Sequence, residues 1–264
     1  MFILDSHNHL ANWGLIPEMV IGPIRISVYS LFVTISLFVG IITYILILRK
    51  YHKVNDSNFA LIFGAITGGI LGAKIVGLLK HFFLVTSTNI IFTFLTSDKS
   101  IVGGILGGMI GIYIVKRLLK IEGRKGNYIA PAVCLSMAVG RIGCFVAGCC
   151  YGVETSLPWG VDFGDNKLRH PTQIYEAIFD MVLFTLLLKL LGKKPKDGQL
   201  FDLFLTSYFV FRFFLEFIKY ENYKILELTI YQIISILVIV KMMWKYRTEI
   251  TLRFNKLNFS KKYN

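Results

Sequence analysis

Long apolar runs that are almost free of charge recur along this chain and leave few ways for it to fold. An α-helix rises about 1.5 Å per residue, so about 20 residues cross the ~30 Å hydrocarbon core of a bilayer. Such runs lie at 28–48, 60–79, 101–115, 128–145, 172–191, 200–217 and 226–240, the third being short. Hydrophobic residues make up 55% of the chain, which favours the membrane class over a soluble one. The sequence therefore predicts an all-α polytopic membrane protein with seven transmembrane helices, forming one integral membrane domain over 1–264.

The formal charge of +13 is unevenly distributed along the chain, and this distribution predicts the orientation of the helices. The main cationic clusters follow the first, third, fifth and seventh runs, and in a seven-helix arrangement these loops share one side. Cytoplasmic loops carry the excess of Lys and Arg, so we expect an outer N-terminus and a cytoplasmic C-terminus. The charge excess is then a topology signal and requires no nucleic acid.

Small residues at intervals of four mark the second and third runs. Helices in lipid associate through close backbone contact over such residues, so these two helices are expected to pack on each other. The residues are Gly64, Gly68, Gly72, Gly103, Gly107 and Gly111.

Polar side chains gather at the predicted outer ends of five helices, where they form a candidate site. A charged residue inside a membrane segment usually has a function, and arginine suits a phosphodiester because its planar fork donates two parallel hydrogen bonds. An anion site of Arg141, Arg212 and Lys74 would bind a phospholipid. The alternative is that Arg212 pairs with Glu216, that Arg141 pairs with Glu154 or Glu176, and that Lys74 extends to the interface. The gathered residues are Tyr29, Lys74, Arg141, 170–176, Arg212 and Glu216.

The candidates for proton transfer are His170, Tyr175, Glu176 and Glu216, because a general base must titrate and reach the reacting group. His170 before a proline is equally explained as a residue at the start of a helix, and Tyr29 as an aromatic residue at the membrane interface.

Four cysteines, Cys134, Cys144, Cys149 and Cys150, leave several interpretations open. They lack the CxxC or HxxxH spacing that favours zinc, and they could also form a disulfide, act as a nucleophile or simply pack a crowded helix end. We assign them no catalysis and expect no metal.

Four stretches of the chain resemble the bacterial prolipoprotein diacylglyceryl transferases. They read GPIRISVYSLF, GRIGCFVAGCCYG, RHPTQIYEA and FRFFLEF and span most of the chain, and GRIG followed by HPTQxYE is a specific pair. The resemblance implies seven spans in the bacterial plasma (inner) membrane, with a site open to the outer leaflet. It implies that the diacylglyceryl group of phosphatidylglycerol is transferred to the lipobox cysteine of preprolipoprotein signal peptides. Glycerol phosphate is released, and no cofactor is needed.

The same resemblance implies roles for individual residues. Arg141 matches the lipid-binding arginine of the family, Arg212 and Glu216 match a second arginine and the acid one turn on, and Tyr29 and Gly152 match its tyrosine and closing glycine. The expected catalytic residues are Tyr29, Arg141, His170, Arg212 and Glu216. The expected substrate-binding residues are Lys74, Gly103, Gly104, Arg141, Gly152, Gln173, Tyr175 and Glu176.

Three positions depart from the family pattern. Val102 precedes Gly103 and Gly104 where the family has histidine, Lys74 stands for an arginine and Cys144 for an asparagine. Two other functions therefore stay open: a related lipid-modifying transferase with a different acceptor, and a non-catalytic phospholipid-binding or transport protein.

Overall fold

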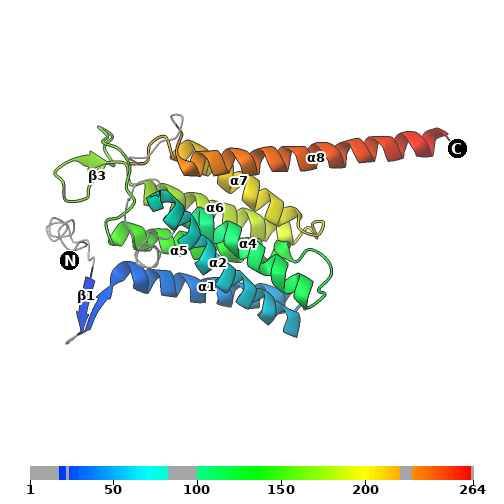
Figure 1. Ribbon diagram of the computed structural model, residues 1–264, viewed down its shortest axis with the longest axis horizontal. Coiled ribbons are helices and arrows are strands. Elements are labelled where there is room, and N and C mark those ends of the chain that lie inside the picture. Colours follow the sequence, from blue (N-terminus) through cyan, green and yellow to red (C-terminus); the bar gives the residue numbers. More distant parts are fainter. Residues whose placement is uncertain (1–17, 22–23, 83–99, 221–227, 263–264) are drawn as a thin grey trace. The chain divides into compact units, whose positions relative to one another are not determined.

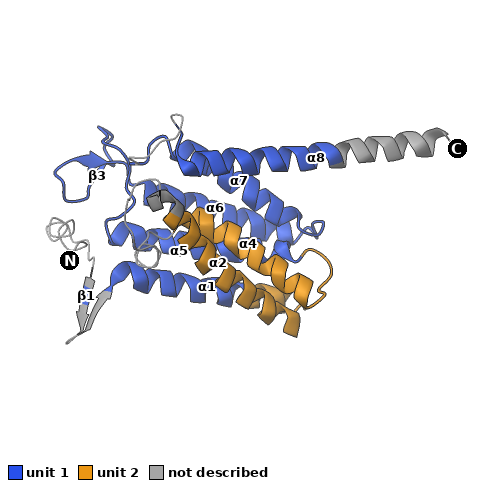
Figure 2. Ribbon diagram, viewed as in Figure 1, with its two compact units in different colours: residues 1–44, 125–264 blue, residues 45–124 orange. Residues whose placement is uncertain are grey.

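The computed structural model describes residues 18–21, 24–82, 100–220 and 228–262 (Figure 1). The chain divides into two compact units, one of residues 1–44 and 125–264 and the other of residues 45–124 (Figure 2). Each unit is described by itself below.

Seven helices lie in the described part of the chain, close to the seven predicted runs. They are α1 (Val28–Lys50), α2 (Asp56–Phe82), α4 (Ile101–Leu118), α5 (Gly126–Val146), α6 (Thr172–Leu191), α7 (Gln199–Leu215) and α8 (Ile230–Lys262). The run at 172–191 coincides with α6, and the short third run becomes an 18-residue helix. The seventh differs most, because α8 begins at Ile230 rather than at 226 and continues into the basic segment beyond 240.

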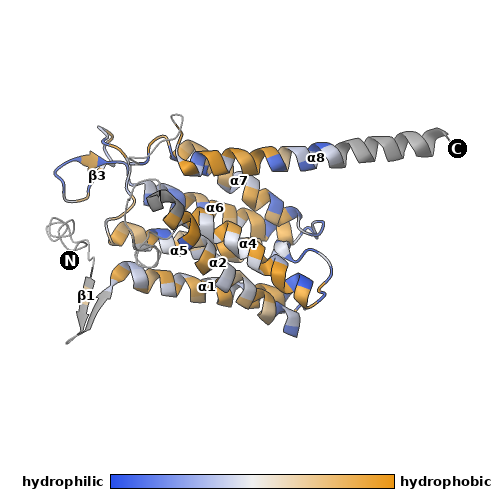
Figure 3. Ribbon diagram, viewed as in Figure 1, coloured by the Kyte–Doolittle hydropathy of each residue, from blue (hydrophilic) through white to orange (hydrophobic). Residues whose placement is uncertain are grey.

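Four of these helices are long and apolar enough to cross a membrane. The spans are Val28–Lys50, Asp56–Leu78, Ile101–Leu118 and Gly126–Val146. Figure 3 shows hydrophobic residues along the helices and hydrophilic ones gathered in loops. The multi-pass membrane character predicted from the sequence is confirmed, whereas seven crossings and their direction stay predictions.

Helix α6 shows the membrane pattern in another way, because its polar side faces inward. Gln173, Glu176 and Asp180 are buried, while Ile178 and Val182 on the other side are 59% and 60% exposed. A helix that hides its charges and exposes its aliphatic side chains is suited to a lipid environment.

Two short antiparallel hairpins, which the sequence did not predict, accompany the helices. The first pairs β1 (Glu18–Ile21) with β2 (Ile24–Ser27), and the second pairs β3 (Val161–Asp162) with β4 (Leu168–Arg169). The second hairpin lies in the loop between α5 and α6.

Within the second unit, α2 and α4 pack through their glycines, as predicted. A Cβ atom on Gly68 would lie 2.3 Å from the carbonyl oxygen of Gly107, and one on Gly72 would lie 2.3 Å from that of Gly103. These separations are shorter than atomic contact allows, so only glycine permits this approach of the two backbones.

Within the first unit, α5 is the central helix. At its C-terminal end a Cβ atom on Gly143 would lie 2.2 Å from Cβ of Phe32 in α1, which explains the glycine of the GRIG sequence. At its other end the buried Asn127 accepts a hydrogen bond from the Leu200 amide at 2.9 Å, joining α5 to the start of α7. Helix α8 joins α7 there through an ion pair of Lys245 with Asp202.

Candidate functional site

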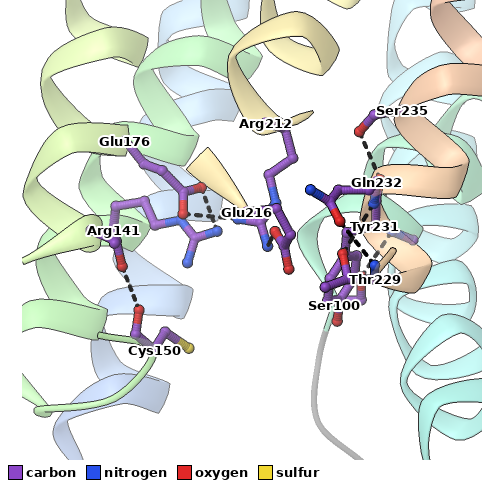
Figure 4. A network of polar contacts seen from close by, with 12 residues as sticks. Ser100, Arg141, Cys150, Glu176, Arg212, Glu216, Thr229, Tyr231, Gln232 and Ser235 are labelled. Atoms are coloured by element: carbon purple, nitrogen blue, oxygen red, sulfur yellow. Dashed lines mark hydrogen bonds and ion pairs between the residues drawn. The ribbon is translucent and has the colours of Figure 1, made fainter. Parts of the chain in front are cut away.

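A buried carboxylate held between two guanidiniums forms the centre of the first unit. Oε2 of Glu176 lies 2.5 Å from an Arg141 nitrogen, and Oε1 lies 2.9 Å from an Arg212 nitrogen (Figure 4). Arg141 comes from α5, Glu176 from α6 and Arg212 from α7. The ion pairs therefore join three helices at one point.

Because the three side chains of this network are buried, each of their charges must be paired with an opposite charge. Glu176 is 1% exposed, Arg141 4% and Arg212 2%. Transferring a single charge of this kind into a nonpolar interior costs several kcal/mol, so each charge must find an opposite charge close by. The network is thus a fixed feature of this bundle.

Arg212 has two further contacts that fix its orientation. Its other terminal nitrogen lies 2.9 Å from Glu216 Oε2, one helical turn on, and its guanidinium carbon lies 5.0 Å from the centre of the Tyr231 ring in α8. A cation over an aromatic face is attracted by the ring's electron density. Arg212 is therefore held by α6, α7 and α8.

These contacts decide between the pairings that the sequence left open. The predicted pair of Arg212 with Glu216 is present, and Arg141 pairs with Glu176. Glu154, the other partner considered for Arg141, instead forms an exposed ion pair with Lys167 in the loop. Sequence spacing alone could not show that the loop turns Glu154 away from α5.

Lys219 is a buried cation of the site that sequence reasoning missed. It follows α7, and it is 9% exposed. Burial lowers the pKa of Lys219, and so do the positive charges of Arg212 and Arg141, against an opposing effect of Glu176. The sequence signal that could have identified Lys219 is its position three residues after Glu216. Lys219 is thus a third cation of the site, and the Glu176 carboxylate acts electrostatically on it as well as on the two arginines.

Backbone hydrogen bonds around Gly152 join the segment after α5 to the segment before α6 and to the segment after α7. The Gly152 amide donates to the His170 carbonyl at 2.8 Å, and the Val153 amide donates to the Ile218 carbonyl at 2.9 Å. A Cβ atom on Gly152 would lie 2.5 Å from the Ile218 oxygen, so a side chain has no room there. The predicted site residue Gly152 therefore shapes the backbone beside Lys219.

Gln173, at the start of α6, donates a hydrogen bond to the backbone of the segment that follows α5. Its Nε2 donates to the Cys149 carbonyl at 2.6 Å, and the Thr172 hydroxyl donates to the Cys150 carbonyl at 2.8 Å. Helix α6 begins at Thr172 directly after Pro171, as the sequence predicted, since proline lacks the N–H that a first helical turn leaves unpaired.

His170 and Tyr175 are brought together, with a third aromatic residue that the sequence did not single out. Nδ1 of His170 lies 3.2 Å from the Tyr175 hydroxyl, which accepts a hydrogen bond from Trp159 Nε1 at 2.8 Å. Neither residue contacts the arginines through a hydrogen bond.

The hairpin of this loop is held by Arg169 and Asp165. The Arg169 Nε donates to Asp165 Oδ2 at 2.7 Å, and its guanidinium carbon lies 4.9 Å from the centre of the Tyr220 ring. Partial burial would raise the pKa of Asp165, but the hydrogen bond and charge of Arg169 outweigh this effect and lower it.

Asp180 is a second residue that sequence reasoning missed. It lies one turn after Glu176, it is 0% exposed, and neither of its oxygens has a hydrogen-bond partner among the described residues. An acid in the middle of a predicted span was the signal for it.

The other predicted residues divide between the two units. The Tyr29 hydroxyl, in α1, lies close enough to Arg141 and to the nearby cysteine thiols to interact with them electrostatically. Lys74, Gly103 and Gly104 belong to the second unit, so their part in this site stays a prediction.

Comparison with known proteins identifies the family of the chain. A family model for prolipoprotein diacylglyceryl transferase matches residues 18–246. The chain belongs to the prolipoprotein diacylglyceryl transferase family. The resemblance that the sequence motifs indicated is thereby confirmed.

Curated members of this family carry the name phosphatidylglycerol–prolipoprotein diacylglyceryl transferase. The protein from Clostridium tetani is 36% identical over 65% of this chain and 71% of its own length. The second protein of this name from Clostridium perfringens is 32% identical over 76% of this chain and 83% of its own length. The protein from Wolbachia pipientis wMel is 31% identical over 89% of this chain and 95% of its own length.

Glu176→Gln tests whether this transferase-family network holds its helices together. The change leaves two buried guanidiniums without their shared charge, and breaking such a pair costs about 3 to 5 kcal/mol. We expect a large fall in the melting temperature of the purified protein in detergent. Glu154→Gln, which breaks an exposed pair worth less than about 1 kcal/mol, is the matched control. Equal melting temperatures for the two variants would contradict this account.

Proposed function

We propose that this protein transfers the diacylglyceryl group of phosphatidylglycerol to the lipobox cysteine of preprolipoproteins. The observation that carries the proposal is the buried pair of arginines, Arg141 and Arg212, in a member of the prolipoprotein diacylglyceryl transferase family. The names of the curated relatives state the lipid donor and the protein acceptor.

The chemistry of the site suits a lipid phosphate. Glu176 and Glu216 hold the two guanidiniums, yet Nε of each arginine has no hydrogen-bond partner among the described residues, and both nitrogens are buried. We assign these donors, together with the Lys219 ammonium, to the oxygens of a phosphodiester that enters the site. Arginine forks and a lysine point charge are the usual protein partners of phosphate.

The reaction requires stabilisation of a leaving group. The thiolate of the acceptor cysteine attacks the glycerol carbon that carries the phosphate, a sulfur–carbon bond forms, and the carbon–oxygen bond to phosphate breaks. The electron pair of that bond leaves with glycerol phosphate. Arg141 and Arg212 stabilise the charge that develops on the phosphate, and because ion pairs already hold them, little reorganisation is needed during the reaction.

The acceptor thiol must also lose its proton. Of the bases predicted from the sequence, Glu176 and Glu216 are engaged with arginines, whereas His170 contacts the Tyr175 hydroxyl. His170 with Tyr175 is therefore the pair that we assign to proton transfer, and Tyr29, Gln173 and Gly152 position the surrounding chain.

We also propose that the site opens to the outer leaflet of the bacterial plasma membrane. In a seven-span arrangement the loop between α5 and α6 is outside, and the basic loop after α6 is cytoplasmic. A thiol reagent that cannot cross the membrane should label Ser156→Cys in intact cells and not Lys193→Cys, both compared with the unchanged chain. The reverse labelling pattern would contradict this orientation.

The test of function is transfer from phosphatidylglycerol to a lipobox peptide by Arg141→Lys. Lysine keeps the charge but loses the two-pronged geometry, and removal of one preorganised donor typically costs about a hundred-fold or more in turnover. We expect a loss of that size, with the variant still folded by its melting curve.

Arg117→Lys is the matched control, because Arg117 is exposed in α4 and hydrogen-bonds Tyr113. It should transfer at the wild-type rate. Near-normal transfer by Arg141→Lys would exclude the phosphate role of Arg141. Lipid binding without any transfer by the wild type would indicate a different acceptor or a non-catalytic lipid-binding protein.

A further inference from the structure

Three cysteine thiols converge beside the arginine network. The Sγ atoms of Cys144, Cys149 and Cys150 all lie within 4.8 Å of one another. Cys144 comes from the last turn of α5, and the other two come from the turn that follows it. Cys134, the remaining cysteine, lies buried earlier in α5 and is outside this cluster.

The turn that carries Cys149 and Cys150 is held in place by its neighbours. The Cys149 amide donates to the Cys144 carbonyl at 3.0 Å, and Gln173 and Thr172 donate to the carbonyls of Cys149 and Cys150. Cys150 has a φ of 65°, a left-handed conformation that residues with a side chain seldom adopt. Such strain persists only where surrounding contacts impose it, and it is common at functional sites.

The charges around the cluster suit thiolates. Arg141 and Lys219 both act electrostatically on Cys150, and the Lys219 side chain is buried. Three thiolates around a divalent ion carry a net charge of about −1, which the charge of Lys219 would balance.

We propose that Cys144, Cys149 and Cys150 bind one zinc-like metal ion, whose open fourth position takes the acceptor thiol of the transfer reaction. Zinc prefers tetrahedral thiolate sites with bonds of about 2.3 Å, so bound sulfurs lie about 3.8 Å apart, and the cluster needs only a small contraction. Three protein ligands with an open position are typical of catalytic rather than structural zinc sites. The proposal rests on the transferase function proposed above.

The metal ion would supply the activated thiol for the same reaction. The acceptor thiol binds the metal, its proton passes to His170 or to water, and the bound thiolate attacks the glycerol carbon. The sulfur–carbon bond forms, the carbon–oxygen bond to phosphate breaks, and the thioether product is a weaker metal ligand that can leave. No oxidant or reductant is consumed.

Cobalt binding tests the site without any assay of activity. The full-length protein is purified in detergent with a phosphine reductant, stripped with a chelator and titrated with Co²⁺. We expect one Co²⁺ per chain, with thiolate-to-cobalt charge-transfer absorption and the visible bands of a tetrahedral site. Cys144→Ala, Cys149→Ala and Cys150→Ala should lose this spectrum, and Cys134→Ala should keep it.

Two outcomes of this titration would overturn the proposal. One is the absence of thiolate-to-cobalt absorption in the wild type, including the case in which mass spectrometry shows that two of the three thiols are a disulfide. The other is an equal loss of the spectrum in Cys134→Ala. Melting curves of the metal-free variants show whether a lost spectrum reflects lost folding.

The acceptor role is tested by adding the lipobox peptide to the cobalt form. A peptide with its cysteine should increase the charge-transfer absorption, because a fourth sulfur joins the metal, and the same peptide with serine should not. An unchanged spectrum with both peptides would contradict this role.

Transfer by metal-free and zinc-loaded protein then separates this proposal from the transferase function. A thiol of pKa about 8.5 is only about 3% ionised at pH 7, so removing zinc should slow transfer by up to about thirty-fold there and by less at pH 9. Full transfer without metal would overturn the metal site and leave the transferase intact. Zinc binding without any transfer would overturn the transferase function and the acceptor role with it.

Discussion

The Glu176 carboxylate between the guanidiniums of Arg141 and Arg212 is the interaction on which the first unit depends. Buried charges of this kind are stable only when each finds its partner, so α5, α6 and α7 must meet at this point. The same condition explains why α6 turns its polar side inward and exposes aliphatic residues. It also leaves the arginines oriented before any ligand arrives, which is the state that electrostatic catalysis requires.

The helices of this protein could be predicted from its sequence because lipid imposes a simple rule. Backbone groups must be satisfied within each segment, so apolar runs become helices and glycines at intervals of four become contacts, as between Gly68 and Gly107. The start of α8 and the two hairpins were not predictable in this way. They lie in segments at or outside the ends of the long apolar runs, where local turns and not hydropathy decide the conformation.

The residues of the candidate site that could be predicted are the charged residues within or at the ends of apolar runs. Arg141, Glu176, Arg212 and Glu216 were identified on that ground, and they meet in the structure. Lys219 lay beyond the predicted span, and the meeting of Cys144 with the two later cysteines depends on a turn that no spacing rule describes. Partners brought together by a loop, unlike partners one helical turn apart, require the tertiary fold.

The most direct test is a structure of this protein determined in bilayers that contain phosphatidylglycerol. The account predicts a lipid whose phosphate oxygens lie about 3 Å from nitrogens of Arg141 and Arg212, with Lys219 oriented toward the same group and the acyl chains along exposed apolar faces. A phosphatidylglycerol bound with its phosphate away from both arginines, while the ion pairs of Glu176 stay unchanged, would contradict it.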